Sequence, residues 1–97
     1  MAVKVVIAAR ALADLTDLIE SRDLPADTGR RVRTSLEQLE TFPLLGKRLT
    51  GRWRPFRMLL GTWPWMLLIY LYAEETGTVT VVAIHDARSV SSATSEG

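Results

Sequence analysis

The sequence predicts an α+β fold: an N-terminal strand, an α-helical hairpin, and then a three-stranded antiparallel meander, with the helices packed on one face of the sheet. Three observations support this prediction. Alternating β-branched residues open the chain, apolar residues at helical spacing follow, and the second half holds three apolar segments separated by short turns. Consecutive strands joined by short turns pair as antiparallel neighbours, and a helix pair then covers one face. The predicted order of elements is β-α-α-β-β-β.

The first strand and the first helix are predicted from a change of period. Val3, Val5 and Ile7 alternate with Lys4 and its neighbours, as in a strand. From about Arg10 to Ser21 the apolar positions recur at helical spacing and predict an amphipathic helix with a buried stripe. That stripe consists of Leu12, Leu15 and Ile19.

A turn at residues 24–27 leads into the second predicted helix, which Pro25 or Asp27 is placed to open. Its buried stripe consists of Val32, Leu36 and Leu39. Pro43 ends this helix, because proline removes a backbone donor and restricts the residue before it. Two helices joined by so few residues are expected to pack as an antiparallel hairpin.

The second half of the chain predicts a loop over 43–55 and three strands over 56–60, 65–72 and 79–84. Turns at 61–64 and 74–77 connect these strands. Residues 65–72 are apolar at every position, which is typical of a central strand covered on both faces. Because the helix pair covers only one face, we expect a partner to cover the other.

Size and composition limit the possible functions. The chain of 97 residues predicts one domain, 1–97, in which 89–97 form a small polar tail. It has no cysteine and a single histidine, so we expect no metal site, no cofactor and a cytoplasmic location. The uncharged stretch 58–73 is shorter than the roughly 18–20 residues that span a bilayer, so we expect no membrane contact.

Basic residues are concentrated in the middle of the chain. The segment from Arg30 to Arg57 holds eight basic and two acidic residues, whereas the whole chain has a net charge of only +1. Such a concentration repels itself and usually faces an anionic partner. The predicted binding surface consists of Lys47, Arg48, Arg52, Trp53 and Arg54, in which an aromatic side chain among cations suits base stacking or an interface. The alternative is a solvated loop.

A second set of residues would matter if the protein cleaved RNA. Cleavage through the 2′-hydroxyl needs a base, an acid and cations around the phosphorane. Arg57 and Arg88 lie at predicted strand ends, and His85 is the only side chain whose unperturbed pKa is near neutrality. The structural alternatives are a strand-end histidine bonded to backbone, and a salt bridge from Arg57 to an acidic helix residue. Trp63 and Trp65 suit core and turn packing.

Several short segments, in this order, resemble the RelE/ParE superfamily of toxins from type II toxin–antitoxin systems. The resemblance covers about residues 3–89. Its markers are the segments 11–15 (ALADL), 39–43 (LETFP) with Gly46, Arg57, 68–70 (LIY) and 83–88 (AIHDAR). Details lean toward the ParE branch: Trp63-Pro64-Trp65 and the following apolar run resemble its Phe-Pro-Tyr segment, and 85–88 resembles its His-Gly-x-Arg ending. Leu67 stands where RelE-type ribonucleases usually carry arginine, and no aromatic residue follows Arg88.

This resemblance implies a toxin that is neutralised by a cognate antitoxin in a hetero-oligomer. The ParE branch implies inhibition of DNA gyrase by protein contact, without a reaction of the toxin's own, and a role in plasmid stabilization. The alternatives are a RelE-like ribosome-dependent mRNA endonuclease using Arg57, His85 and Arg88, or an inactive member that only binds its antitoxin.

Overall fold

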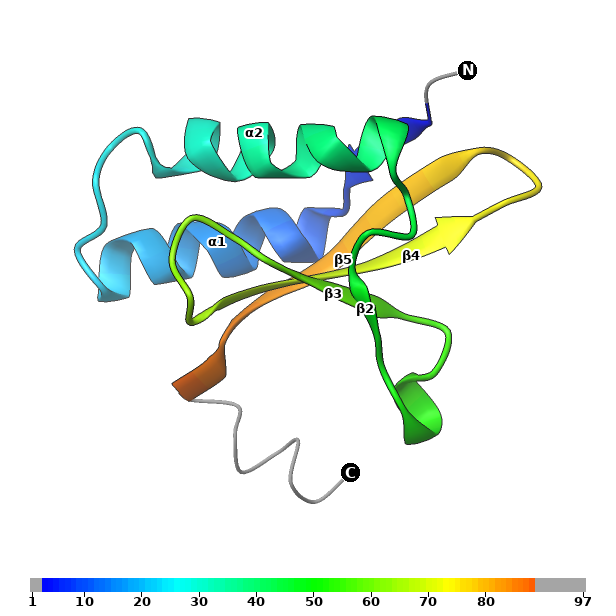
Figure 1. Ribbon diagram of the computed structural model, residues 1–97. Helices are drawn as coiled ribbons and strands as arrows, with labels where there is room; N and C mark the ends of the chain where they lie inside the picture. The colour runs from blue at the N-terminus through cyan, green and yellow to red at the C-terminus, as the bar shows by residue number, and fades with distance from the viewer. Residues whose placement is uncertain (1–2, 89–97) are drawn as a thin grey trace.

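A five-stranded mixed sheet carries both helices on one of its faces (Figure 1). The computed structural model describes residues 3–88, and the tail expected over 89–97 lies outside them. The strand order is β1-β5-β4-β3-β2, with β1 parallel to β5 and all other pairs antiparallel. The elements are β1 Lys4–Ile7, α1 Ala9–Ser21, α2 Thr28–Thr41, β2 Lys47–Arg48, a 3-10 helix Gly51–Trp53, β3 Arg57–Leu60, β4 Met66–Ala73 and β5 Thr78–Asp86.

The structure confirms the predicted fold and corrects one segment. The meander β3-β4-β5 is present, β4 is the central strand, and the helices form a hairpin on one face. The prediction of a continuous loop over 43–55 is wrong, because Lys47–Arg48 pair with β3 and Gly51–Trp53 form a helical turn. A strand of two residues carries no alternating pattern, so sequence periodicity could not detect it.

The helices use the predicted stripes with one exception. In α2 Val32, Leu36 and Leu39 are all buried, and in α1 Leu15 is buried beside Ala11. The prediction is wrong at Leu12, which is 46% exposed. At the start of α2 the Thr28 hydroxyl donates to the carbonyl of Pro25 at 2.6 Å, which fixes the end of the connecting turn.

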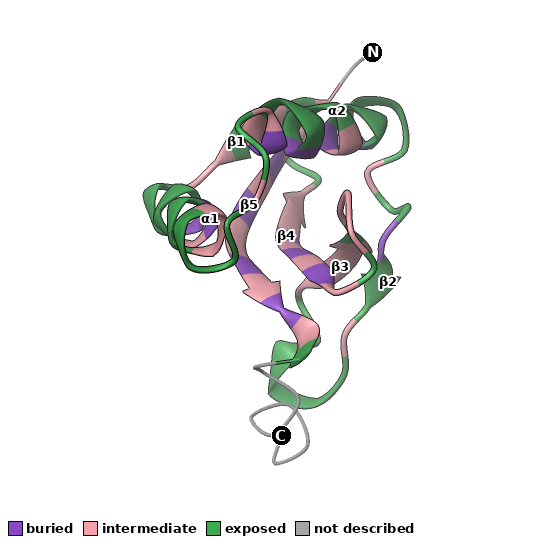
Figure 2. Ribbon diagram, turned by 90° about the vertical axis from the view of Figure 1, so that its left-hand side faces the viewer, coloured by how far each residue is buried: buried purple, intermediate pink, exposed green. Residues whose placement is uncertain are grey.

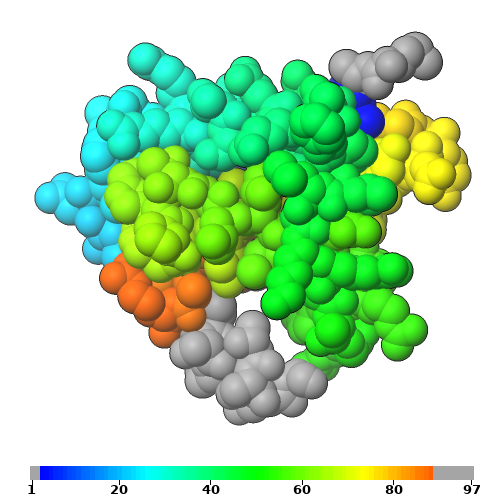
Figure 3. All heavy atoms as spheres, viewed as in Figure 1, coloured from blue at the N-terminus to red at the C-terminus, as the bar shows by residue number. Residues whose placement is uncertain are grey.

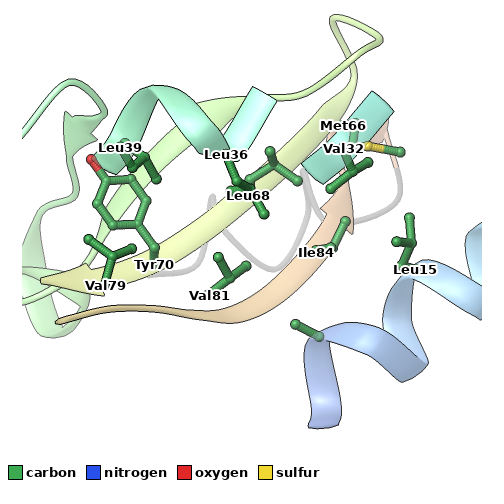
Figure 4. Close-up of a cluster of buried hydrophobic side chains, with 11 residues drawn as sticks. Leu15, Val32, Leu36, Leu39, Met66, Leu68, Tyr70, Val79, Val81 and Ile84 are labelled. Atoms are coloured by element: carbon green, nitrogen blue, oxygen red, sulfur yellow. The ribbon is translucent and has the colours of Figure 1, made fainter. Parts of the chain in front are cut away.

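The hydrophobic core lies between the helices and the sheet. Met66, Leu68 and Tyr70 of β4 are fully buried against α2 and β5 (Figure 4). The alternate residues Leu67 and Ile69 are only partly buried and lie on the opposite face. Within residues 3–88, no helix packs on that opposite face (Figure 2). The helices therefore cover one face of the apolar strand β4 and leave its other face open, which is where the sequence predicts a partner.

None of the helices in the described part of the chain is long and apolar enough to cross a membrane.

Candidate functional site

A network of hydrogen bonds around Tyr70 fixes the loop that leads from α2 to the basic segment. The Tyr70 hydroxyl donates to the carbonyl of Pro43 and accepts the backbone N–H of Gly46, both at 2.8 Å. Arg57 Nη1 donates to the carbonyls of Gly46 and Leu44 at 3.0 and 3.3 Å. Burial raises the pKa of Tyr70, so the phenol stays neutral and able to donate.

This network explains the position of Arg57. Arg57 is paired with Tyr70 across β3 and β4, so both side chains lie on the helix-bearing face. The alternative of a salt bridge from Arg57 to an acidic helix residue is not found among the described residues, where the hydrogen bonds of Arg57 go to loop carbonyls. Arg57 therefore holds the loop in place.

Replacing Tyr70 with phenylalanine tests this network. The change leaves the Gly46 N–H and the Pro43 carbonyl without their partner while keeping the ring. We expect a loss of about 1–3 kcal/mol in the free energy of unfolding, the usual effect of leaving a buried polar group unpaired. Urea denaturation followed by circular dichroism measures it. A Tyr72→Phe variant, at a partly exposed position on the same strand, is the matched control and should change stability little.

The predicted binding residues lie together at one edge of the sheet. Lys47 and Arg48 form β2, the last strand of the sheet, and Arg52, Trp53 and Arg54 follow in and after the 3-10 turn. All five are exposed. None of the four cations pairs with a carboxylate within residues 3–88. Figure 3 shows this green segment as one edge of the visible face. We call these five residues the basic edge, and its role in binding stays a prediction.

Several contacts give the basic edge a defined shape. Trp53 and Phe56 contact each other with ring centroids 5.9 Å apart. Arg48 Nε donates to the carbonyl of Arg54 at 3.4 Å. Gly51 opens the turn with a φ of 64°, a conformation that glycine adopts without strain. The cations are therefore displayed from an ordered turn.

The remaining candidate cation, Arg88, belongs to a separate cluster around Asp86. Arg88 Nε and Nη2 donate to the two carboxylate oxygens of Asp86 at 3.0 and 2.9 Å, and Arg22 Nε donates at 3.0 Å. The Arg88 guanidinium also lies over the Trp65 ring, 4.7 Å from its centroid. Trp65 is stacked on Trp63 at 5.9 Å. The cluster joins the end of α1, the β3–β4 turn and the end of β5.

Asp86 is a buried charged residue for which the sequence predicted no role. Its side chain is only 1% exposed, and the hydrogen bonds from Arg88 hold the pKa of its carboxyl well below the usual range, against the opposing effect of burial. The alternation of β5 contained the signal, because Ile84 and Asp86 share a sheet face and Ile84 is apolar. A carboxylate at a buried position of a strand requires cationic partners.

His85 lies on the other face of the sheet. It is paired with Leu67, which pairs in turn with Leu60, so its nearest cross-strand neighbours are apolar. The expected hydrogen bond from this side chain to backbone is not found in the described part of the chain. Arg57 pairs with Tyr70, which follows Leu67 by three positions on β4, and it faces the helices. The structure therefore does not gather Arg57, His85 and Arg88 into one cluster, and their catalytic role stays a prediction.

No group of three or more potential metal ligands occurs among residues 3–88.

Comparisons with known proteins give structural matches only. No family model matches the chain, and no curated protein matches it in sequence. A solved structure of the toxin–antitoxin complex RelBE2 from Mycobacterium tuberculosis matches with a TM-score of 0.66 and 20% identity, covering 89% of this chain and 99% of that one. The isolated RelE toxin of E. coli matches with a TM-score of 0.64 and 19% identity, covering 98% of both chains. A metal-bound toxin from Helicobacter pylori matches with a TM-score of 0.61 and 18% identity, covering 91% and 98%.

The chain therefore has the fold of RelE-type toxins. This agrees with the superfamily that the sequence motifs resemble, but these matches give no support to the ParE branch. At such low identity they carry the fold alone.

Proposed function

We propose that this protein is the toxin of a type II toxin–antitoxin module and is silenced by a cognate antitoxin. The single observation that carries the proposal is the combination of a RelE-type fold with a half-covered central strand. One relative in fold was solved as a complex of toxin and antitoxin. An antitoxin segment on the helix-free face would bury Leu67 and Ile69, and acidic residues on it would neutralise the basic edge.

For the mechanism we propose RelE-like, ribosome-dependent mRNA cleavage ahead of gyrase inhibition. The named relatives in fold include RelE toxins, and the basic edge presents four exposed cations and a tryptophan that suit a phosphate backbone and its bases. His85 on the open face would act as the base, and Arg88 would stabilise negative charge at the phosphate. Arg57 would act by holding the loop next to the basic edge.

Gyrase inhibition of the ParE type remains the second candidate, supported by a specific observation. Leu67 is the cross-strand neighbour of His85 and pairs in turn with Leu60, so the open face beside the only histidine is apolar. An apolar face fits a protein partner better than an RNA phosphate, which needs cations within hydrogen-bonding distance.

Induced expression of this protein alone in a bacterial host separates these mechanisms. An mRNA endonuclease is expected to stop incorporation of radiolabelled methionine within minutes and to leave mRNA ends in register with codons. A gyrase inhibitor is expected to cause DNA breaks and filamentation while translation continues. Growth that is unaffected by expression, with soluble toxin present, would contradict both mechanisms and leave an inactive antitoxin-binding member.

Charge reversal at the basic edge tests its role in the same assay. Arg52→Glu is expected to reduce growth inhibition at least about tenfold, measured as surviving colonies, because it places an anion where a phosphate or acidic partner would lie. Arg10→Glu makes the same change in charge at an exposed position on α1 and is the control. Equal toxicity of the two variants would remove the basic edge from the mechanism.

A further inference from the structure

Three large apolar side chains are exposed at neighbouring positions of the loop that leads from α2 to β2. Phe42, Leu44 and Leu45 are 63%, 58% and 48% exposed. They line a shallow hollow of about 520 Å³ together with Tyr72 and Glu74. Single exposed leucines are ordinary on a protein surface, whereas apolar side chains gathered around one hollow mark an interaction site. We call these five residues the loop patch.

Hydrogen bonds hold the loop patch in a fixed shape. The backbone N–H of Leu45 donates to the carbonyl of Phe42 at 3.0 Å, which closes a tight turn. Arg57 Nη1 donates to the carbonyl of Leu44 at 3.3 Å, next to the network around Tyr70. The loop backbone is thus bound to the sheet while its large side chains stay exposed. A surface that is already ordered loses little conformational entropy when a partner binds.

The two ends of the loop patch carry opposite charges. Glu74 lines the hollow at the β4–β5 turn, and Glu75 follows it. At the other end Arg48 pairs with Arg57 across β2 and β3, so it lies beside the residue that binds the loop. Arg57 pairs in turn with Tyr70, four positions before Glu74, which sets the two ends roughly 13 Å apart along β4. Within residues 3–88 Glu74, Glu75 and Arg48 form no ion pair.

We propose that the loop patch is the contact surface of a homodimer, in which two copies of this chain pair around a two-fold axis. Such an axis brings the same patch of both copies together, in opposite directions. It therefore places Glu74 of one copy opposite Arg48 of the other at both ends of the contact. Between these ends, Phe42 and Leu44 of each copy pack against the hollow of the other.

A second copy fits this surface better than a partner of a single charge. An acidic segment would meet Glu74 and a basic segment would meet Arg48, whereas a patch with opposite ends complements itself. The chain has a net charge of only +1, so two copies repel each other little. In Figure 3 the yellow β4–β5 turn and the green basic edge lie apart on this side of the molecule. The two basic edges of the dimer are therefore held away from each other.

The proposed dimer leaves the open face of β4 uncovered. Tyr72 pairs with Val79, which belongs to the core between the helices and the sheet, so the loop patch lies on the helix-bearing side. The inference thus needs neither toxin activity nor an antitoxin, and purified protein alone tests it.

Sedimentation equilibrium at increasing protein concentration measures the pairing. We expect the apparent mass of the wild type to rise from one chain toward two. Leu44→Ser should weaken dimerisation at least about tenfold, because it removes apolar contact at the centre of the patch. Leu60→Ser, at a leucine of similar exposure on the open face, is the control and should dimerise like the wild type. A wild type that remains a single chain at about 1 mM, or equal dimerisation of the two variants, would overturn the proposal.

An exchange of charges tests the two-fold arrangement itself. Glu74→Arg places two arginines opposite each other and Arg48→Glu places two glutamates opposite each other, so each variant alone should dimerise at least about tenfold more weakly. Mixed in equal amounts, the two variants should form a heterodimer in which both ion pairs are restored. Circular dichroism establishes that each variant is folded. A mixture that associates no better than its components, or single variants that dimerise like the wild type, would contradict the proposed pairing.

Discussion

Replacing Gly46 with alanine is expected to lower the free energy of unfolding by about 3 kcal/mol, the upper part of the range for overpacking a filled site. A Cβ atom at this position would lie 2.7 Å from Tyr70 Cε1 and 2.8 Å from the backbone oxygen of Met58. Neither neighbour can move easily, because two hydrogen bonds fix the tyrosine hydroxyl and Met58 belongs to β3. The loop would therefore have to shift away from the sheet.

Urea denaturation of Gly46→Ala measures this effect, and Gly29→Ala is its control. Gly29 lies in α2, and a Cβ built there meets no atom within 4 Å. Alanine in an open helical position raises stability by about 0.5–1 kcal/mol. The same chemical change should thus have opposite signs at the two glycines. A neutral Gly46→Ala variant would show that the loop is not held against Tyr70 as the structure has it.

Replacing Asp86 with asparagine is expected to lower the free energy of unfolding by about 2 kcal/mol at neutral pH. The substitution removes the charge that accepts hydrogen bonds from Arg22 and Arg88, and hydrogen bonds to charged groups contribute roughly 1.5–3 kcal/mol. The figure is lower than for a fully buried ion pair, because the Arg22 and Arg88 side chains are 38% and 61% exposed and regain hydration.

The pH dependence of this difference follows from the lowered pKa of Asp86. A carboxyl group whose pKa is lower in the folded than in the unfolded protein stabilises the fold above its unfolded pKa of about 3.9. That contribution is lost as the pH falls below about 5 and through the folded pKa. Unfolding curves for the wild type and Asp86→Asn should therefore converge between pH 5 and pH 2. A constant gap over this range would mean that the effect of Asp86 comes from packing.

Most of the secondary structure could be predicted because it rests on local periodicity. The residues of α2 that recur at helical spacing are those that the structure buries, and the apolar segment 65–72 predicts the central strand. β2 could not be predicted, since Lys47 and Arg48 form a strand only through pairing with Met58 and Arg57. That the residues of the basic edge lie together was predictable because their charge is concentrated within a few residues of sequence, and their role in binding stays a prediction.

The roles of single polar residues were much less accessible. The sequence left open a phosphate contact or a salt bridge for Arg57, and it gave no sign of the hydrogen bonds that Arg57 makes to the loop carbonyls of Leu44 and Gly46. The burial of Asp86 depends on Arg88, which is two positions away, and also on Arg22, which is 64 positions away. Leu12 fits the buried stripe of its helix, yet β1 and α2 leave it half exposed. In each case the partner is remote in sequence.

By itself the sequence determined the order of both helices and of every strand except β2, the central place of the apolar strand, and the concentration of cations in the segment that precedes it. These features depend on alternation, helical spacing and charge within short windows, where neighbouring residues suffice. Only the tertiary structure decided that Arg57 and His85 lie on opposite faces, that Asp86 joins the ends of α1 and β5, and that a groove remains open beside Leu12. These outcomes depend on sheet register and helix placement, which bring together residues that no local pattern connects.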